Sequence, residues 1–127
     1  YYTALEASQK GTCDITAWLA WFLECFSQAL DSSDLAMEKA RMVGRFWNRF
    51  RHVGLNARQR KVLARLLEAG PGGFEGGLSN RKYRAMTRAS QATATRDLVE
   101  LVRLGALEPV GSGRSQRYEI VLDLEER

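Results

Sequence analysis

Residues 78–121 read LSNRKYRAMTRASQATATRDLVELVRLGALEPVGSGRSQRYEIV, and this stretch decides the fold. Ser79 is a good N-cap for the short helix that follows it, and the segment RAS after that helix predicts a tight turn. Ser90 caps a second helix, which ends at Gly105. Two short strands come next, Leu107–Val110 and the segment RYEIV, joined by the turn GSGRSQ. A short helix, a tight turn, a second helix and a hairpin, in this order, are typical of a winged helix-turn-helix.

Apolar residues at helix and strand spacing give this region a core. A further helix precedes it, because Asn56 is a good N-cap for residues 57–69 and Gly70 fits the position just past a helix end. The glycine-rich residues 71–77 predict a loop, and no strand-loop-helix unit surrounds them as dinucleotide binding would require. The positions expected to face inward are Val62, Leu63, Leu66, Leu67, Tyr83, Met86, Ala94, Leu98, Leu101, Val102, Tyr118 and Ile120.

The first half of the chain also predicts helices. Asp14 is a candidate N-cap for residues 15–30, which are apolar around nearly the whole helix and therefore need partners on both sides. The polar residues Asp31–Asp34 predict a break, followed by a second helix over residues 35–52. The apolar face expected for that second helix consists of Ala36, Ala40, Val43, Trp47 and Phe50.

The fold class that follows is mainly α. Residues 1–9 are interpreted as the end of a helix, and residues 1–53 together as a helical segment. We expect this segment to pack on a winged helix-turn-helix of three helices and a small β wing over residues 54–127. The surplus of apolar side chains in the first half predicts an incompletely covered surface and a homodimer.

Charge is distributed unevenly along the chain, whose formal net charge is +4. Residues 1–34 hold one base and five acids, and residues 35–55 hold five bases and one acid. Residues 56–118 hold twelve bases and five acids, and residues 119–127 hold one base and four acids. The positive charge of the winged-helix region suits an anionic partner such as DNA, while a solvated basic surface is the alternative from charge alone.

The second helix of the motif carries the candidate reading surface. Gln91, Ala92, Thr95 and Arg96 lie near its N-terminus on the side away from the core, where this motif contacts base edges. Arg96 can form a bidentate contact with guanine or bind a phosphate. Phosphate contacts are predicted for the surrounding basic residues Arg81, Lys82, Arg84, Arg88, Arg114 and Arg117. A protein-interaction or dimerisation module that does not bind DNA remains the alternative, because this fold serves several functions.

Other function classes find little support in the sequence. Cys13, Cys25 and His52 are too few and too widely spaced for a metal site, and Cys25 is expected to be a small core residue. The best apolar run, residues 15–26, is about half the length that a bilayer requires. No histidine is placed to activate a serine or threonine nucleophile, so no catalytic residue is predicted. The unpaired thiols suit a reducing, cytoplasmic compartment.

Residues 1–23, YYTALEASQKGTCDITAWLAWFL, resemble the closing part of the Fic domain in bacterial Fic/Doc (Fido) proteins. Many members of that family carry a C-terminal winged helix similar to residues 55–121. The resemblance implies a parent protein that transfers AMP to protein hydroxyls (AMPylation), as an adenylyltransferase that uses ATP and Mg²⁺. Its catalytic loop would read His-Pro-Phe-x-x-Gly-Asn-Gly-Arg.

That catalytic loop does not occur in this chain, since its one histidine, His52, is followed by Val53, Gly54 and Leu55. The resemblance therefore implies a fragment without catalytic residues or cofactors of its own, and a catalytic loop upstream of Tyr1. It also implies that the Fic domain of the same protein is a partner, and that the chain is a regulatory or targeting module.

Overall fold

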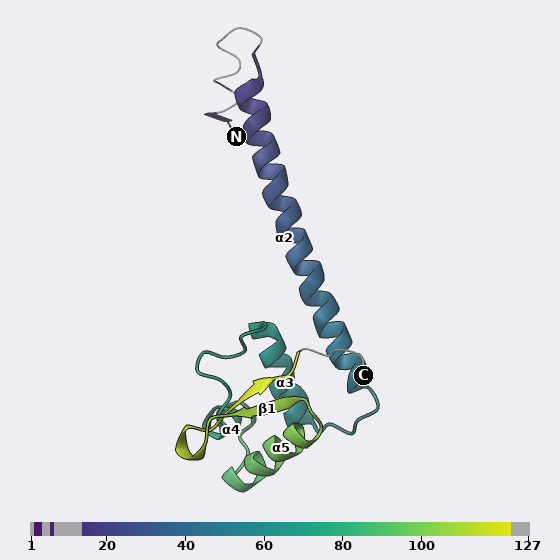
Figure 1. Cartoon of the computed structure of the whole chain (residues 1–127), viewed down its shortest axis with the longest axis vertical. Helices are drawn as coiled ribbons and strands as arrows, with labels where there is room; N and C mark the ends of the chain where they lie inside the picture. Colours follow the sequence, from purple (N-terminus) through teal and green to yellow (C-terminus); the bar gives the residue numbers. More distant parts are fainter. Residues whose placement is uncertain (1, 4–5, 7–13, 123–127) are drawn as a thin grey trace. The chain divides into compact units, whose positions relative to one another are not determined.

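The structure, a computed structural model, describes residues 2–3, 6 and 14–122 of the chain. It is mainly helical, with a small two-stranded antiparallel sheet (Figure 1). The chain divides into two compact units, Tyr1–Arg41 and Met42–Arg127. Most of the helix end predicted over residues 1–9, and Cys13, lie outside the described residues.

One long helix, α2 (Thr16–Arg49), occupies much of the first half and spans 34 residues. Its start follows the predicted cap, because Asp14 Oδ1 accepts hydrogen bonds from the backbone amide of Thr16, at 3.0 Å, and from the Thr16 hydroxyl. The helical main-chain hydrogen bonds begin with the carbonyl of Ile15, which accepts from the amide of Leu19. Asp14 thus satisfies a donor that helix geometry leaves open.

The helix break predicted at Asp31–Asp34 is wrong, because α2 continues through these residues. The hydroxyls of Ser32 and Ser33 donate to the carbonyls one turn earlier, those of Gln28 at 2.9 Å and Ala29 at 3.0 Å. Serine can therefore stay inside a helix when its hydroxyl bonds back to the preceding turn. Residues 27–43 contain neither Gly nor Pro, so nothing in this segment forces the helix to end.

The part of α2 in the first unit has many large apolar side chains open to solvent. The rings of Trp18, Phe22 and Phe26 stack along it, with centroid separations of 5.5 and 6.2 Å. Cys25 is also exposed, so the expectation that it belongs to a core is wrong. The incompletely covered surface is confirmed for the described residues; its large members are Ile15, Leu19, Trp21, Phe22, Leu23, Phe26, Leu30, Leu35 and Met37.

The second unit contains the remaining elements. In chain order these are α3 (Ala57–Ala69), α4 (Asn80–Thr87), α5 (Gln91–Arg103), β1 (Leu107–Val110), the short 3-10 helix η1 (Gly113–Ser115) and β2 (Arg117–Ile120). The predicted caps of the three helices are confirmed, since Asn56, Ser79 and Ser90 each accept a backbone N–H with their side chain. The side chain of Gln59 in turn accepts the backbone N–H of Asn56, which completes a capping box. This capping box was not predicted from the sequence.

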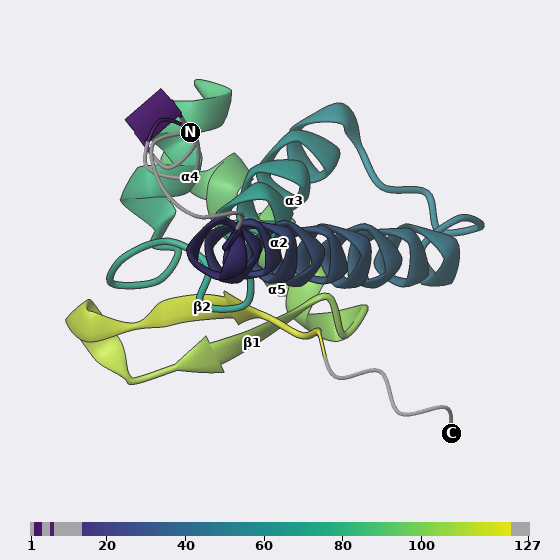
Figure 2. The same ribbon diagram turned by 90° about the horizontal axis from the view of Figure 1, so that it is seen from above.

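β1 and β2 pair antiparallel and run side by side in both views of the molecule (Figures 1 and 2). Their register places Leu107 opposite Ile120 at one end and Val110 opposite Arg117 at the other. An isolated bridge joins Leu78 to Tyr118, with main-chain hydrogen bonds of 3.0 and 2.8 Å. This bridge ties the end of the glycine-rich loop to β2 just before α4 begins.

The core of the second unit includes the end of α2. Phe46 in α2 and Phe50 just after its last residue are almost fully buried, while Val43 and Trp47 pack against the same cluster. The unit therefore begins at Met42, inside α2, and the boundary expected at residue 54 falls within it. The other buried apolar residues are Leu55, Val62, Leu63, Leu66, Leu67, Leu78, Tyr83, Ala94, Leu98, Leu101, Ala106, Leu107 and Ile120. Met86, Val102 and Tyr118, also predicted to face inward, are half-buried against this core.

Candidate nucleic-acid interface

One side of α5 is open to solvent and the other forms part of the core. The outer face of α5 is defined by Gln91, Ala92, Thr95, Arg96 and Val99, all exposed. Successive residues of a helix turn by about 100°, so these five cover an arc of about 140° with Gln91 and Arg96 at its two edges. The opposite side consists of Ala94, Asp97, Leu98 and Leu101, all buried. The structure thus brings together the four residues predicted to contact base edges.

Val99 is the member of this face that was not predicted from the sequence. Its side chain is 58% exposed, although valine is usually buried. Val99 lies one helical turn after Thr95, and this spacing could have predicted from the sequence that the two residues share a face. The outer face of α5 therefore has an apolar middle between a polar edge and a basic edge.

The segment that leads up to and includes the start of α5 carries bases but no acids. Residues 76–96 contain five bases and no acid, although Glu75 precedes them and Asp97 follows. The basic residues are Arg81, Lys82, Arg84, Arg88 and Arg96, of which the four arginines are exposed. Arg88 lies at the C-cap of α4 with φ of 57°, in the left-handed region, and its N–H donates to the carbonyl of Arg84. It therefore forms the corner between α4 and α5.

Lys82 differs from the four arginines because two of the three N–H donors of its ammonium group already bond to backbone carbonyls. Nζ donates to the carbonyl of Gly77 at 2.8 Å and to that of Glu75, and it lies 5.9 Å from the ring centroid of Phe74. The side chain is half-buried. Lys82 thus holds the glycine-rich loop against α4, while its charge still adds to the basic surface.

The hairpin contributes two further arginines. Arg114 lies in η1 at the turn and is exposed. Arg117 is half-buried, and its Nη1 donates to the carbonyl of Gln116 at 3.0 Å. A hollow joins Arg117 to the start of α4; it is lined by Gly76, Ser79, Arg81, Lys82, Ala85 and Arg117. Three of the basic residues predicted to contact phosphates therefore meet at one hollow.

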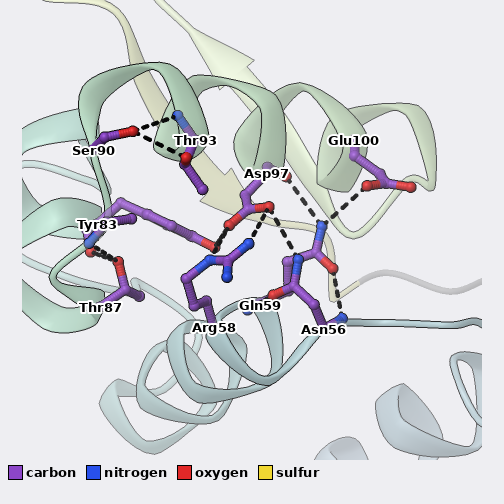
Figure 3. Close-up of polar contacts among 10 residues, drawn as sticks. Asn56, Arg58, Gln59, Tyr83, Thr87, Ser90, Thr93, Asp97 and Glu100 are labelled. Carbon is purple, nitrogen blue, oxygen red and sulfur yellow. Dashed lines mark hydrogen bonds and ion pairs between the residues drawn. The ribbon is translucent and has the colours of Figure 1, made fainter.

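Asp97, next to Arg96 on α5, forms a buried polar junction between three helices (Figure 3). Its carboxylate accepts hydrogen bonds from Asn56 Nδ2 at 3.0 Å, Arg58 Nε at 2.8 Å and the Tyr83 hydroxyl at 2.8 Å. A second guanidinium nitrogen of Arg58 lies 3.3 Å from Oδ1. The junction joins α5 to the start of α3 and to α4. It was not predicted from the sequence, although Asp97 falls at helix spacing among apolar core positions.

The charges of this junction follow from its hydrogen bonds. Burial alone would raise the pKa of Asp97, but hydrogen bonds from Arg58, Tyr83 and Asn56 outweigh it and hold that pKa below its usual value. Burial raises the pKa of Tyr83 strongly, and its hydrogen bond to Asp97 adds to this. The hydrogen bond to Asp97 raises the pKa of Arg58 as well. At neutral pH the junction therefore holds an ionised carboxylate, a protonated phenol and a guanidinium.

A second polar contact links α4 to α5 on the solvent side. Asn80 Nδ2 donates to the Thr95 hydroxyl at 3.0 Å, and this hydroxyl donates to the carbonyl of Gln91 at 2.9 Å. Together with the Asp97 junction, it fixes the rotation of α5 about its own axis. Fixed rotation keeps one side of a helix directed outward, which is what a preformed binding face requires.

Within residues 2–3, 6 and 14–122, no group of three His, Cys, Asp or Glu side chains is close enough to hold a metal ion. Among the same residues, no helix has both the length and the apolar character needed to cross a bilayer.

No protein-family model matches the chain. A search of curated proteins finds no matching sequence.

Proposed function

We propose that the unit Met42–Arg127 is a winged helix-turn-helix that binds duplex DNA, with α5 in the major groove. The observation that carries this proposal is the outer face of α5, which is exposed, rotationally fixed and preceded by an acid-free basic segment. A major groove about 12 Å wide admits an α-helix, and its base edges carry the sequence information. The order α3, α4, α5, β1, β2 supplies the elements of such a module.

Each residue of the candidate interface has a role in this proposal. Gln91, Ala92, Thr95 and Arg96 contact base edges, with Arg96 as the candidate guanine ligand. Lys82 supports the loop and acts mainly through its charge, because carbonyl oxygens already occupy two of its three N–H donors. The residues that bind phosphates are Arg81, Arg84, Arg88, Arg114 and Arg117.

Fluorescence anisotropy with duplex DNA across a salt series tests the proposal. Replacing Arg114 by Ala should weaken binding to all sequences and lower the salt slope by about one unit, because one phosphate is no longer neutralised. Replacing Arg96 by Ala should cost about 1–3 kcal/mol at a selected site. Arg65→Ala is the matched control, because Arg65 is an exposed arginine on α3 outside the proposed surface. Binding no stronger at low salt than that of a neutral protein would contradict DNA binding.

The second candidate function is protein interaction through α2, favoured by the apolar side chains exposed on the first unit. We propose a second copy of the chain as the partner. Large side chains such as Leu19 and Phe26 lie in the first half of α2, and the exposed small residues Ser33, Ala36 and Ala40 lie in the second. Antiparallel pairing would place Phe26 opposite Ser33 and Leu19 opposite Ala40, so that large side chains meet small ones.

The resemblance to Fic/Doc proteins supports a wider proposal, that the chain is a cytoplasmic regulatory or targeting part of an adenylyltransferase. The gene should then encode a His-Pro-Phe-x-x-Gly-Asn-Gly-Arg loop in the same polypeptide. The chain of residues 1–127 alone should transfer no label from ATP to proteins in the presence of Mg²⁺, because it lacks the base and the phosphate loop. Robust transfer by the purified chain would overturn this wider proposal.

A further inference from the structure

We infer that the outer face of α5 recognises thymine methyl groups, so that the DNA it prefers presents a thymine to Thr95 and Ala92. This inference rests on the proposed DNA binding and specifies what the face reads. It begins from Thr95, a residue that would ordinarily be expected to recognise bases through its hydroxyl.

Two of the three hydrogen-bonding positions of the Thr95 hydroxyl are already used within the protein. Its single hydrogen is donated to the carbonyl of Gln91 at 2.9 Å, and its oxygen accepts from Asn80 Nδ2 at 3.0 Å. A hydroxyl has one donor and two acceptor positions, so one acceptor position and no donor remain for a base. The γ-methyl group is the part of this exposed side chain that no hydrogen bond holds.

The neighbours of Thr95 have the same chemistry. Ala92 lies about one turn before Thr95 and Val99 one turn after it, and both are exposed, so three methyl-bearing side chains share the middle of the arc. The thymine C5 methyl is the apolar group that base pairs present in the major groove. Gln91 at one edge can bind adenine and Arg96 at the other can bind guanine. The face thus fits a site in which a thymine lies between hydrogen-bonded purines.

The experiment starts from DNA selected by the chain of residues 1–127 out of a pool of random duplexes. Each thymine of the selected site is then replaced singly by deoxyuridine, which lacks only the C5 methyl group. At one or more positions the affinity should fall about three- to fivefold, the effect expected when one methyl-sized group is no longer buried. The replacement leaves every hydrogen-bonding group of the base pair in place.

Thr95→Ser identifies the protein side of the contact, because serine keeps the hydroxyl and its two hydrogen bonds but lacks the methyl group. This variant should lose the same factor on the thymine duplex and nothing more on the deoxyuridine duplex. Thr93→Ser is the matched control in the same helix. Thr93 lies outside the outer face of α5, and its hydroxyl accepts from Ser90 at 2.9 Å. Discrimination between thymine and deoxyuridine should be unchanged in this control.

Two results would overturn the inference while DNA binding stands. One is a change of less than about twofold at every deoxyuridine position, below the effect of one buried methyl group. The other is an equal loss for Thr95→Ser on both duplexes. Failure of the proposed function looks different, because no duplex would then be enriched and no salt-dependent binding would be seen.

Discussion

Two helical regions of the molecule, the first part of α2 and helix α5, both contain several apolar side chains but differ in how far these are buried. Leu98 and Leu101 on α5 are fully buried, whereas Leu23 and Leu30 on α2 are 61% and 51% exposed. Both pairs lie in helices whose apolar residues recur at helix spacing. Spacing therefore determines that a helix forms and which residues share a face, but burial depends on which other elements are present to cover that face.

The largest effect expected from this difference is on stability. Leu98→Ala should lower the free energy of unfolding by about 2–5 kcal/mol, because it removes buried methyl groups and leaves a cavity. Leu23→Ala makes the same chemical change at an exposed site and should stay within about 0.5 kcal/mol. Urea unfolding followed by circular dichroism measures both variants. Equal losses would mean that Leu23 is covered in solution, and the comparison would fail.

The next largest effect concerns the polar junction inside the second unit. Asp97→Ala leaves the Tyr83 hydroxyl and the Asn56 amide without their shared acceptor, and it removes the partner of Arg58. We expect a loss of about 2–4 kcal/mol, somewhat below that of a fully buried ion pair because the Arg58 side chain is 41% exposed. Thermal unfolding checks this, with exposed Glu108→Ala on β1 as the control. A loss no larger than the control's would show that the junction contributes little.

Self-association of the chain tests whether the exposed apolar side chains of α2 are covered by a second copy. If two copies pair through α2, Phe26→Ala should weaken that association by about 10- to 100-fold, the cost of one buried phenylalanine. Gln28→Ala is the control, since Gln28 lies on the same helix and bonds to Glu24 Oε1. Sedimentation equilibrium over a range of concentrations gives both dissociation constants. A wild-type chain that stays monomeric at high concentration would contradict pairing.

The junction also predicts how stability depends on pH. The pKa of Asp97 in the folded chain lies below its ordinary value, so the carboxylate stabilises the fold above the unfolded pKa of about 3.9. This stabilisation is lost as the pH falls through the folded pKa. Between about pH 5 and pH 2, wild type should lose more stability than Asp97→Asn, which does not titrate. Parallel acid unfolding curves for the two proteins would show that Asp97 does not cause the loss of stability at low pH.

Local signals in the sequence were sufficient to predict where α3, α4 and α5 begin. Asn56, Ser79 and Ser90 begin their helices as predicted, because an N-cap depends on a few neighbouring residues. The break at Asp31–Asp34 was wrong for a related reason, since serine fits a cap and a back-bonded helix interior alike.

Contacts between residues far apart in the sequence could not be predicted from the spacing of apolar residues. Phe46 enters the core of the second unit, and Asp97 meets Arg58 across 39 positions of the sequence. Neither contact is visible before the helices are packed together. The outer face of α5 was predicted except for Val99, because helix periodicity alone fixes which side of α5 faces away from Leu98.

Arg88 illustrates how stability and the proposed DNA binding can make opposite demands on one residue. It is the one non-glycine residue of the described chain with a positive φ, 57°, a conformation that costs an L-residue about 1–2 kcal/mol. Arg88→Gly should therefore raise the melting temperature by a few degrees while weakening DNA binding in the salt series described above. No gain in melting temperature would show that the turn is unstrained. Selection for thermostability alone would therefore favour glycine at position 88, whereas the proposed phosphate contact would favour arginine.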